Sequence, residues 1–482
     1  MKLKTLIKNL KYTKIIGSTE LEIKDLAASS TLVTDGALFI ALCGNTFDGN
    51  SFIRQAELYG AKAVITEKEL TTTLTQIIVP NARKAMSFVS AEFYGRPSEK
   101  MKIIGVTGTN GKTTTTYIIK SILDSAGIKC GVIGTLGIVY DKVYVEPSLT
   151  TPDPIALHKT LAEMYKKGVK VVVMEVSAHA LYYDKTNDVS FEVGVLTNFT
   201  QDHLDFFGNM EDYKKAKKKF FEKDRCKFKV VNSDDALGVE LLSEDNKIIS
   251  YGIENPSDVF AIDLVSDDFG SEFVLNLFDV IYDVDLSLIG NFNVYNAMAG
   301  ATATALIGVP TEKIIRGLCS IKTVSGRLEL VYKADFSVYI DYAHTPDGLE
   351  KTLSALKGIC RGRLICVFGC GGNRDKEKRP LMGSISGKYA DFTVITSDNP
   401  RFEEPMDVIS SIEEGLLKET RNYVVVQERA EGIKYALDYA KKGDVVLIAG
   451  KGSEKYQEIL GIKHVYNDKD TVKELVKGKN RC

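Results

Sequence analysis

The chain has 482 residues, which at roughly 150 residues per domain predicts about three domains, each able to bury its own core. Its 62 basic and 64 acidic residues leave a formal net charge of −2, so it lacks the cationic excess that draws proteins to nucleic acid or an anionic membrane. Hydrophobic residues at 44% and charged residues at 26% are typical of globular proteins and argue against a disordered or fibrous chain.

The cysteines and the start of the chain indicate where the protein acts. Its eight cysteines form no Cys-x-x-Cys pair, so we interpret them as reduced thiols and expect a cytoplasmic protein. Lysines interrupt the first 14 residues and argue against a secretory signal. The strongest apolar stretches, such as 171–174, are far shorter than the ~20 residues that span a bilayer. We therefore expect no membrane partner and no nucleic-acid partner.

Short apolar runs alternate with helical patterns over residues 1–98, which predicts a small α/β domain. These runs lie at 38–42, 63–65 and 77–79, and the segment closes on a turn-rich stretch at 95–98.

Residues 99–329 and 330–482 each repeat a strand followed by a helix, which predicts mostly parallel sheets with helices on both faces. The sequence thus predicts an α/β protein of three domains, with boundaries near 98 and 329. Polar loops follow the strands, and ligands of open α/β sheets bind beyond the carboxyl ends of strands. The predicted strands are 103–107, 169–176 and 193–198 in the central domain, and 336–342, 364–368, 392–395 and 445–448 in the C-terminal domain.

A glycine-rich segment at 105–114 follows a predicted strand and precedes a helical pattern at 117–126. Glycine lets the backbone approach a phosphate, Lys112 can meet β- and γ-phosphates, and Thr113 can bind Mg²⁺. One departure from the standard spacing is Val106, where a P-loop has glycine. We interpret the segment as a nucleotide-binding loop, with a glycine-rich surface turn as the alternative. The sequence has no Asn-Lys-x-Asp pattern, which counts against a GTPase switch.

Acidic residues and a histidine follow two of the predicted strands. Glu175 ends one strand, where a Mg²⁺ ion at the phosphate loop could reach it. His203 follows the next strand and stands between Asp202 and Asp205. We expect Glu175 and His203 to be metal ligands. The alternative for His203 is a loop histidine that bonds to local backbone.

One lysine in the lysine-rich segment 213–221 stands apart from the others. Lys217 shares a predicted helical stripe with the apolar side chains, whereas the other four lysines of the segment fall off it. A lysine in that position must be paired, shifted in pKa or chemically modified. The apolar members of the stripe are Tyr213, Ala216, Phe220 and Phe221.

Together these segments resemble the Mur ligases, the ATP-dependent amide-forming enzymes of peptidoglycan precursor synthesis. The resemblance implies an N-terminal domain for the UDP sugar, a central P-loop ATPase domain, and a C-terminal Rossmann-like domain for the incoming amino acid. The matching segments follow the family order and span nearly the whole chain: GTNGKTT at 108–114, EVSAH at 175–179, TNFTQDHLD at 197–205, GNFNVYN at 290–296, GRLE at 326–329 and DYAHTPD at 341–347.

The resemblance also implies ATP, Mg²⁺ and a carbamate formed from CO₂ on Lys217. The implied metal ligands are Thr113, Glu175, His203 and carbamylated Lys217. The implied catalytic residues are Lys112, Glu175, His203 and Lys217. The asparagines 293 and 296 would lie on the adenine side, Arg327 at a phosphate and Asp341 at the ribose. The implied ATP-binding residues are Gly108, Thr109, Asn110, Gly111, Lys112, Thr113, Thr114, Asn293, Asn296, Arg327 and Asp341.

Within the family the chain looks like the members that add the third residue of the stem peptide. The residues that match their contacts with UDP-MurNAc-L-Ala-D-Glu are Ser30, Thr150, Thr151, Ser177 and Lys185. The chain departs from the family pattern at Ser29 to Thr31, and at Tyr183 and Lys185, where the family has glutamine and arginine. Lys185 can still meet a phosphate or carboxylate as a point charge.

Two arginines at strand ends, Arg374 and Arg401, provide planar forks for a carboxylate. Meso-diaminopimelate has a carboxylate at its far end and lysine does not, so the arginines favour diaminopimelate. The segment 398–401 also resembles the diaminopimelate motif of the family, and Glu454 suits the distal ammonium. The alternative is that Arg401 is a surface residue after a turn proline. The implied binding residues are Arg374, Asp398, Asn399, Pro400, Arg401, Gly450 and Glu454.

The implied reaction is phosphoryl transfer from ATP to the D-Glu carboxylate, followed by attack of the diaminopimelate amine on the acyl phosphate. We expect a monomer whose partners are these small molecules. A lysine-adding ligase of the same family, a folylpolyglutamate-type ligase and a P-loop ATPase of another class are the alternatives.

Overall fold

The computed structural model describes residues 1–44 and 48–479, so Cys482 lies outside the described residues. The chain forms two compact units, one of residues 1–105, 128–194 and 216–227, the other of residues 106–127, 195–215 and 228–482. Strands β6 (Lys102–Thr107) and β11 (Phe191–Leu196) run across the division. The fold is α/β with mostly parallel sheets, as the sequence predicts.

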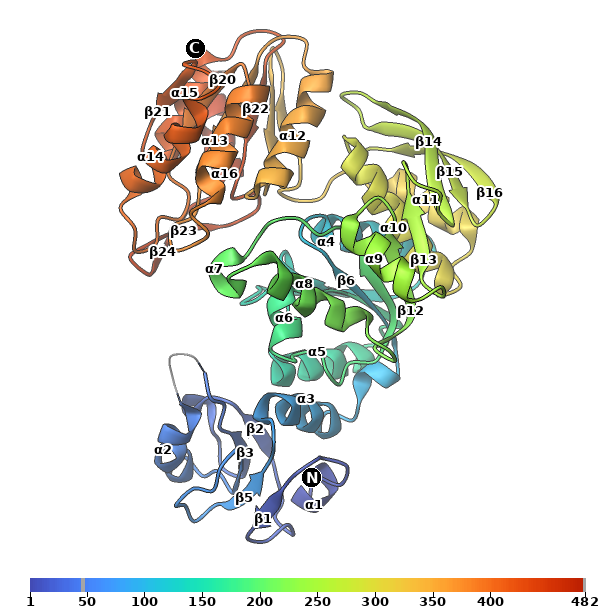
Figure 1. The fold of residues 1–482 in the computed structure, drawn as a ribbon, viewed down its shortest axis with the longest axis vertical. Helices are drawn as coiled ribbons and strands as arrows, with labels where there is room; N and C mark the ends of the chain where they lie inside the picture. Colours follow the sequence, from blue (N-terminus) through green and yellow to red (C-terminus); the bar gives the residue numbers. More distant parts are fainter. Residues whose placement is uncertain (45–47, 480–482) are drawn as a thin grey trace. The chain divides into compact units, whose positions relative to one another are not determined.

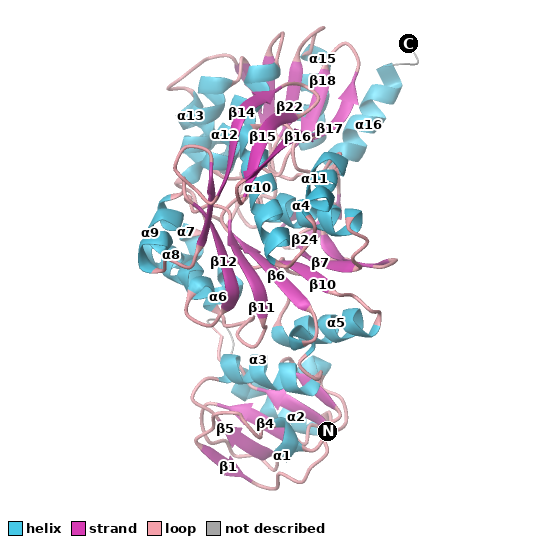
Figure 2. Ribbon diagram, turned by 90° about the vertical axis from the view of Figure 1, so that its right-hand side faces the viewer, coloured by secondary structure: helices cyan, strands magenta, loops and turns pink. Residues whose placement is uncertain are grey.

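The N-terminal sheet has the strand order β1-β5-β4-β3-β2. Only β1 is antiparallel to its neighbour, and the predicted apolar runs overlap β3, β4 and β5. Because side chains alternate along a strand, one face packs against α1 and α3 and the other against α2 (Figure 2). The elements are α1 (Leu3–Leu6), β1 (Lys14–Ile16), β2 (Asp25–Ala27), η1 (Ser30–Leu32), β3 (Ala37–Ile40), η2 (Gly49–Phe52), α2 (Ile53–Leu58), β4 (Ala63–Thr66), β5 (Thr75–Ile78), α3 (Ala82–Phe93) and η3 (Pro97–Glu99).

Helix α5 (Pro154–Lys166) joins this N-terminal sheet to the rest of the first unit. Its Ile155 packs against the N-terminal core, and α5 lies against α3 and η3. A second contact is the guanidinium of Arg83, which lies 4.4 Å from the ring centroid of Tyr183. A cation over an aromatic face is attractive, so Tyr183, where the family pattern has glutamine, contacts the N-terminal segment.

His158 on α5 is fully buried, and neither ring nitrogen has a hydrogen-bond partner among the described residues. Burial, together with the charge of Arg96, lowers the pKa of His158 from 6.5 to about 4. As the pH falls, His158 is therefore protonated in the unfolded chain before it is protonated in the folded chain. The stability that is present above pH 6.5 is lost as the pH falls toward 4.

We expect His158→Leu to raise the free energy of unfolding by about 1–3 kcal/mol, because it removes an unsatisfied buried polar group. It should also flatten the pH dependence of stability between about pH 6.5 and 4. Urea denaturation at several pH values across this window measures both effects. A variant that loses stability with acid as steeply as the wild type would contradict the assignment to His158.

The central region has antiparallel strands that the sequence analysis did not predict. In the first unit β7 (Cys130–Gly134) pairs in parallel with β10 (Val171–Glu175), and β8 (Gly137–Tyr140) and β9 (Val143–Val145) add antiparallel strands. Strand β12 (Cys226–Asn232) begins in the first unit and continues in the second. There β12, β13 (Ile249–Gly252) and β14 (Val259–Ser266) are parallel, followed by antiparallel β15 (Ser271–Leu277) and β16 (Val280–Leu286). Buried and exposed residues alternate in β15, because one face is solvated, so a search for continuous apolar runs misses such strands.

Helix α4 (Lys112–Ser125) begins five residues before the predicted pattern, because the end of the glycine-rich loop forms its first turn. A Cβ at Gly300 of α10 would lie 2.8 Å from Ile118 of α4, so a small residue lets the two helices pack closely. The other helices of this region are α6 (Ala178–Tyr182), α7 (Leu204–Phe207), α8 (Met210–Lys218), η4 (Lys219–Phe221), α9 (Ala236–Glu244), α10 (Asn291–Leu306) and α11 (Thr311–Ser320).

The C-terminal sheet has the order β17-β18-β22-β19-β20-β21, in which only β17 is antiparallel to its neighbour. Helices α12, α13 and α14 pack on one face and α15 and α16 on the other, which confirms a Rossmann-like arrangement (Figure 1). The elements are β17 (Glu329–Lys333), β18 (Ser337–Ile340), α12 (Pro346–Ile359), β19 (Leu364–Phe368), α13 (Lys378–Tyr389), β20 (Phe392–Ile395), α14 (Pro405–Leu416), β21 (Tyr423–Val425), α15 (Arg429–Tyr439), β22 (Val445–Ile448), β23 (Tyr456–Ile459), β24 (Ile462–Val465) and α16 (Asp468–Lys479).

Within residues 1–44 and 48–479, no helix combines the length and the apolar character needed to cross a membrane.

Candidate active site

The glycine-rich loop between β6 and α4 has a shape that only glycine allows at two positions. Gly108 has φ 146°, and a Cβ there would lie 1.8 Å from the hydroxyl of Thr197. Gly111 has φ 83°, and a Cβ there would lie 2.4 Å from Oδ1 of Asn296. The ammonium of Lys112 donates to the carbonyls of Gly108 and of the next residue, each at 2.8 Å. Lysine and backbone therefore form one preorganised loop.

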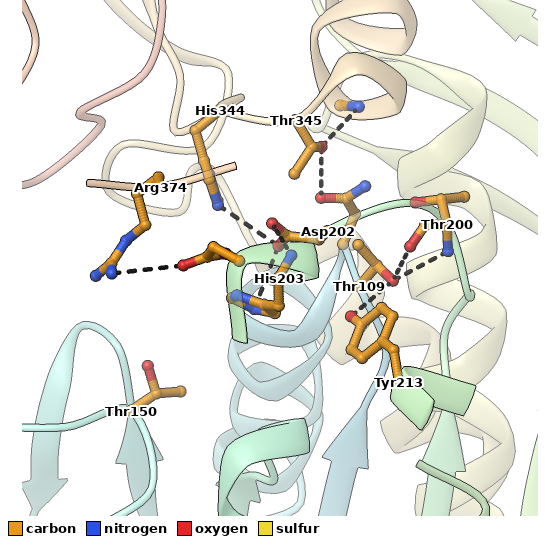
Figure 3. A network of polar contacts seen from close by, with 12 residues as sticks. Thr109, Thr150, Thr200, Asp202, His203, Tyr213, His344, Thr345 and Arg374 are labelled. Atoms are coloured by element: carbon orange, nitrogen blue, oxygen red, sulfur yellow. Dashed lines mark hydrogen bonds and ion pairs between the residues drawn. The ribbon is translucent and has the colours of Figure 1, made fainter. Parts of the chain in front are cut away.

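The segment after β11 holds this loop from the side. Thr197 donates its hydroxyl to the carbonyl of Asn110 at 2.6 Å, and the side-chain oxygen of Asn198 accepts from the backbone N–H of Asn110 at 2.9 Å. The hydroxyl of Thr109 lies 3.1 Å from that of Tyr213 and accepts from the N–H of Thr200 at 3.0 Å (Figure 3). Hydrogen bonds therefore join the glycine-rich loop to the segment after β11, although the two lie far apart in the sequence.

Arg327 presents a buried donor beside the first turn of α4. Its Nη2 donates to the hydroxyl of Thr113 at 2.9 Å, and its guanidinium lies 4.3 Å from the ring centroid of Tyr342. Its Nη1 is buried and has no hydrogen-bond partner among the described residues. Buried polar atoms are nearly always bonded, so an unpaired guanidinium nitrogen at a glycine-rich loop fits an anionic oxygen such as that of a phosphate.

The residues expected at the adenine and the ribose are buried, and each bonds within the protein. Asn296 accepts from the hydroxyl of Thr115 at 3.2 Å and donates to Asn293 at 3.0 Å. Asp341 accepts from the N–H of Ala343 at 2.8 Å, and its burial raises its pKa. Thr114, also predicted at the nucleotide, is buried in the first turn of α4.

Asp202 lies between two histidines from distant parts of the sequence (Figure 3). Its Oδ2 is 3.3 Å from Nε2 of His203 and 3.9 Å from Nε2 of His344. Burial raises the pKa of Asp202, but the charges of the two histidines and of Lys378 outweigh it and lower the pKa to about 2. Neither Asp202 nor His344 was among the predicted site residues, although both stand in segments that resemble the family.

Two of the four predicted metal ligands lie in the first unit. Glu175 ends β10 and accepts from the N–H of Thr135 at 2.8 Å and from its hydroxyl at 3.1 Å. Lys217 is only 1% exposed, whereas the other four lysines of the segment are not buried, which confirms its predicted place on the apolar stripe. The other two, Thr113 and His203, belong to the second unit. In the described part of the chain, no group of three His, Cys, Asp or Glu side chains could hold a metal ion.

Three of the residues predicted at the UDP-sugar substrate come together around the end of β10. The hydroxyl of Thr151 donates to the carbonyl of Glu175 at 2.9 Å and accepts from the N–H of Ser177 at 3.0 Å. Thr150 lies nearby, with its hydroxyl 3.3 Å from that of Thr135. Strands β7 and β10 are adjacent, which places Thr135 beside the end of β10.

The other two predicted residues of this group make contacts of their own. Ser30 opens η1 and donates to the side chain of Gln55 at 2.7 Å. The ammonium of Lys185 lies 2.8 Å from the carboxylate of Asp153.

The two predicted arginines both lie near Gly371, beyond the carboxyl ends of β19 and β20. A Cβ at Gly371 would lie 2.9 Å from Nη1 of Arg401 and 3.6 Å from Cγ of Arg374, so a larger residue there would crowd Arg401. Arg401 donates to the carbonyl of Gly372 at 2.8 Å and pairs with Glu458 at 3.2 Å. Arg374 is half exposed and lies 3.8 Å from the carboxylate of Asp205.

The remaining residues of the predicted amino-acid site form a second cluster at the same edge of the sheet. Asn399 donates to Glu454 at 3.0 Å, and a Cβ at Gly450 would lie 2.8 Å from Oδ2 of Asp398. Pro400 connects this cluster to Arg401. Lys451, which was not among the predicted site residues, lies within the cluster and is fully buried.

Three family descriptions match this chain in order. The Mur ligase family catalytic domain matches residues 22–94, the Mur ligase middle domain residues 106–304, and the Mur ligase glutamate ligase domain residues 326–452. A solved folylpolyglutamate synthase of Mycobacterium tuberculosis has a TM-score of 0.64 at 17% identity, covering 76% of this chain and 92% of its own, a likeness of fold alone.

Full-length relatives agree with these matches. UDP-N-acetylmuramoyl-L-alanyl-D-glutamate–2,6-diaminopimelate ligase 1 of Clostridium acetobutylicum is 43% identical, over 99% of both chains. The ligase of the same name, without the final numeral, from Aquifex aeolicus is also 43% identical, over 95% of this chain and 94% of its own. A solved structure of such a ligase has a TM-score of 0.72 at 30% identity, covering 100% of this chain and 99% of its own. The chain belongs to the Mur ligase family.

Proposed function

We propose that the protein is the ATP-dependent ligase that joins meso-diaminopimelate to UDP-MurNAc-L-Ala-D-Glu in peptidoglycan precursor synthesis. The observation that carries this proposal is the 43% identity, over 99% of both chains, with a ligase named for this reaction. We further propose that it acts in the cytoplasm, as a monomer.

The three predicted domains would divide the substrates among them. Residues 1–98 would bind the UDP sugar, 99–329 the nucleotide and 330–482 the amino acid. Separate five-stranded and six-stranded sheets at the two ends of the chain support this division. The residues proposed to contact UDP-MurNAc-L-Ala-D-Glu are Ser30, Thr150, Thr151, Ser177 and Lys185.

The chemistry begins with transfer of the γ-phosphoryl group of ATP to the D-Glu carboxylate. The backbone N–H groups of residues 108–114 and the start of α4 would hold the phosphates, because a helix N-terminus is electropositive. Lys112 and the unpaired nitrogen of Arg327 would neutralise the charge that develops on the transferring group. Asn293, Asn296 and Asp341 would line the adenine and ribose side. The amine of diaminopimelate then attacks the acyl phosphate, and phosphate leaves.

Thr113, Glu175, His203 and carbamylated Lys217 would hold Mg²⁺. Mg²⁺ prefers oxygen ligands, and a carbamate would turn the buried ammonium of Lys217 into an oxygen donor. The oxygen donors of Thr113, Glu175 and the carbamate therefore fit the ion in their chemistry, whereas His203 would offer a nitrogen. Bound Mg²⁺ would supply positive charge to the phosphate oxygens.

The amino-acid site would hold both charged ends of diaminopimelate. Arg374 and Arg401 would bind the distal carboxylate, and Glu454 the distal ammonium. The remaining proposed contacts are Asp398, Asn399, Pro400 and Gly450.

We expect Arg401→Met to raise the KM for diaminopimelate roughly 10- to 150-fold, because a hydrogen bond to a charged group contributes about 1.5–3 kcal/mol. The KM values for ATP and the UDP-sugar substrate should not change. Steady-state kinetics with each substrate varied in turn measures the effect, with exposed Arg361→Met as the matched control. A variant that keeps its diaminopimelate KM would assign Arg401 to packing alone.

The function itself is tested by measuring phosphate release from ATP in the presence of Mg²⁺ and UDP-MurNAc-L-Ala-D-Glu. Meso-diaminopimelate and L-lysine are added in parallel reactions, and the mass of each product is measured by mass spectrometry. We expect turnover with diaminopimelate. Turnover with lysine alone would keep the family and refute the role of Arg401, and ATP hydrolysis independent of the dipeptide would refute the ligase reaction.

A further inference from the structure

Lys451, in the loop that follows β22, is among the largest fully buried side chains of the described residues. Its ammonium donates to Oδ1 of Asn399 at 2.9 Å and to Oε2 of Glu454 at 2.8 Å. A buried lysine must be paired to remain charged. Both of its hydrogen-bond partners belong to the proposed amino-acid site, and neither belongs to the hydrophobic core.

The lysine fixes the orientation of the Asn399 amide. The same Oδ1 also accepts from the backbone N–H of Glu458 at 2.9 Å, so two donors converge on it. The amide nitrogen must then point the other way, where it donates to Oε2 of Glu454 at 3.0 Å. Glu454 therefore accepts from both Lys451 and Asn399, and the three side chains hold one another in place.

The charges around this cluster do not cancel. Arg429 forms a fully buried pair with Asp468 at 2.8 Å, and Arg401 pairs with Glu458. Among these described side chains, Lys451 is then left as the single cation for two carboxylates, Glu454 and Asp398. Burial raises the pKa of Asp398, but the charges of Lys451 and Arg429 outweigh it and hold the pKa below its usual value. One negative charge is left over, which an ammonium group of a ligand would balance.

We infer that Lys451 is a positioning residue for the amino-acid substrate, which orients Asn399 and Glu454 so that the excess negative charge of the cluster receives the distal ammonium. This inference depends on the proposed function. In this role Lys451 acts through its two partners, Asn399 and Glu454.

The test compares Lys451→Met and Lys451→Gln with the wild type and with Lys473→Met, an exposed lysine of α16. ATP, UDP-MurNAc-L-Ala-D-Glu and the amino acid are each varied in turn. Met fills the space of the lysine stem and removes both hydrogen bonds, so we expect a rise of about tenfold or more in the KM for diaminopimelate only. Gln keeps one donor and loses the charge, so its KM should rise less. The control should match the wild type.

Circular dichroism and melting temperature establish that each variant is folded at the assay temperature. If Lys451→Met does not fold, the KM values of Lys451→Gln test the inference instead. An unchanged diaminopimelate KM in a folded variant, or an equal rise of all three KM values, overturns the inference. If the wild type joins only L-lysine, the proposed selectivity for diaminopimelate is wrong, and the inference on Lys451 is tested by the same comparison of KM values with lysine. If the wild type joins neither, the proposed function and this inference fail together.

Discussion

Lys112→Ala is expected to lower the ligase kcat by about 100- to 1000-fold, the usual cost of removing one preorganised group that stabilises transition-state charge. The ammonium donates to two carbonyls of the glycine-rich loop, which is the proposed phosphate site. Its loss removes a positive charge from the transferring phosphoryl group and two hydrogen bonds from the loop. Phosphate release in the complete reaction mixture measures the effect.

Lys120→Ala, on the same helix, is the matched control, because the side chain of Lys120 pairs with Asp124 on the helix surface. Surface pairs of this kind contribute about 0–1 kcal/mol. Activity of Lys112→Ala within a few fold of the control would mean that the loop does not hold the reacting phosphates. The glycines and the contacts with Thr197 remain in the variant, so the loop should keep its fold.

The strands that could be predicted from the sequence are those buried on both faces. Strands β19, β20 and β22 have the predicted residues, because a parallel strand between two helical layers is a continuous apolar run. Strands β14 to β16 were missed because half of their side chains face solvent and the apolar run is broken. The helical stripe that selected Lys217 was correct for a related reason, since periodicity reports which face is buried.

The site could be predicted only as far as its parts are local in sequence. The glycine-rich loop lies within one segment, and its strand and helix flank it. The unpaired nitrogen of Arg327, the pairing of His344 with Asp202 and the burial of Lys451 each depend on side chains that meet only in the folded chain. Periodicity carries no information about such contacts. The resemblance to a family located segments, and the structure supplied the hydrogen bonds between them.

Lys217→Met is expected to lower the ligase kcat by about 100-fold or more, because a metal ligand contributes several kcal/mol to charge stabilisation in the transition state. Methionine has nearly the shape of the lysine stem, so it should fill the buried position without a cavity. Replacing a buried charged group by an apolar one of similar volume is often neutral or stabilising. The melting temperature should therefore hold or rise while the activity is lost, and Lys215→Met, at an exposed position, should change neither.

The loss of activity alone would not distinguish a carbamate from a plain ammonium, since methionine removes both. Isotopically labelled bicarbonate does distinguish them: a carbamate on Lys217 should give a carbonyl resonance in the wild type and in Lys215→Met that is absent from Lys217→Met. Activity should also rise with bicarbonate in the wild type and in Lys215→Met. If Lys217→Met loses activity and the wild type shows neither the resonance nor the bicarbonate dependence, Lys217 acts as a buried cation and the metal keeps one oxygen ligand fewer. If the variant keeps its activity, the lysine serves packing only, and a buried ammonium on an apolar stripe needs no chemical role.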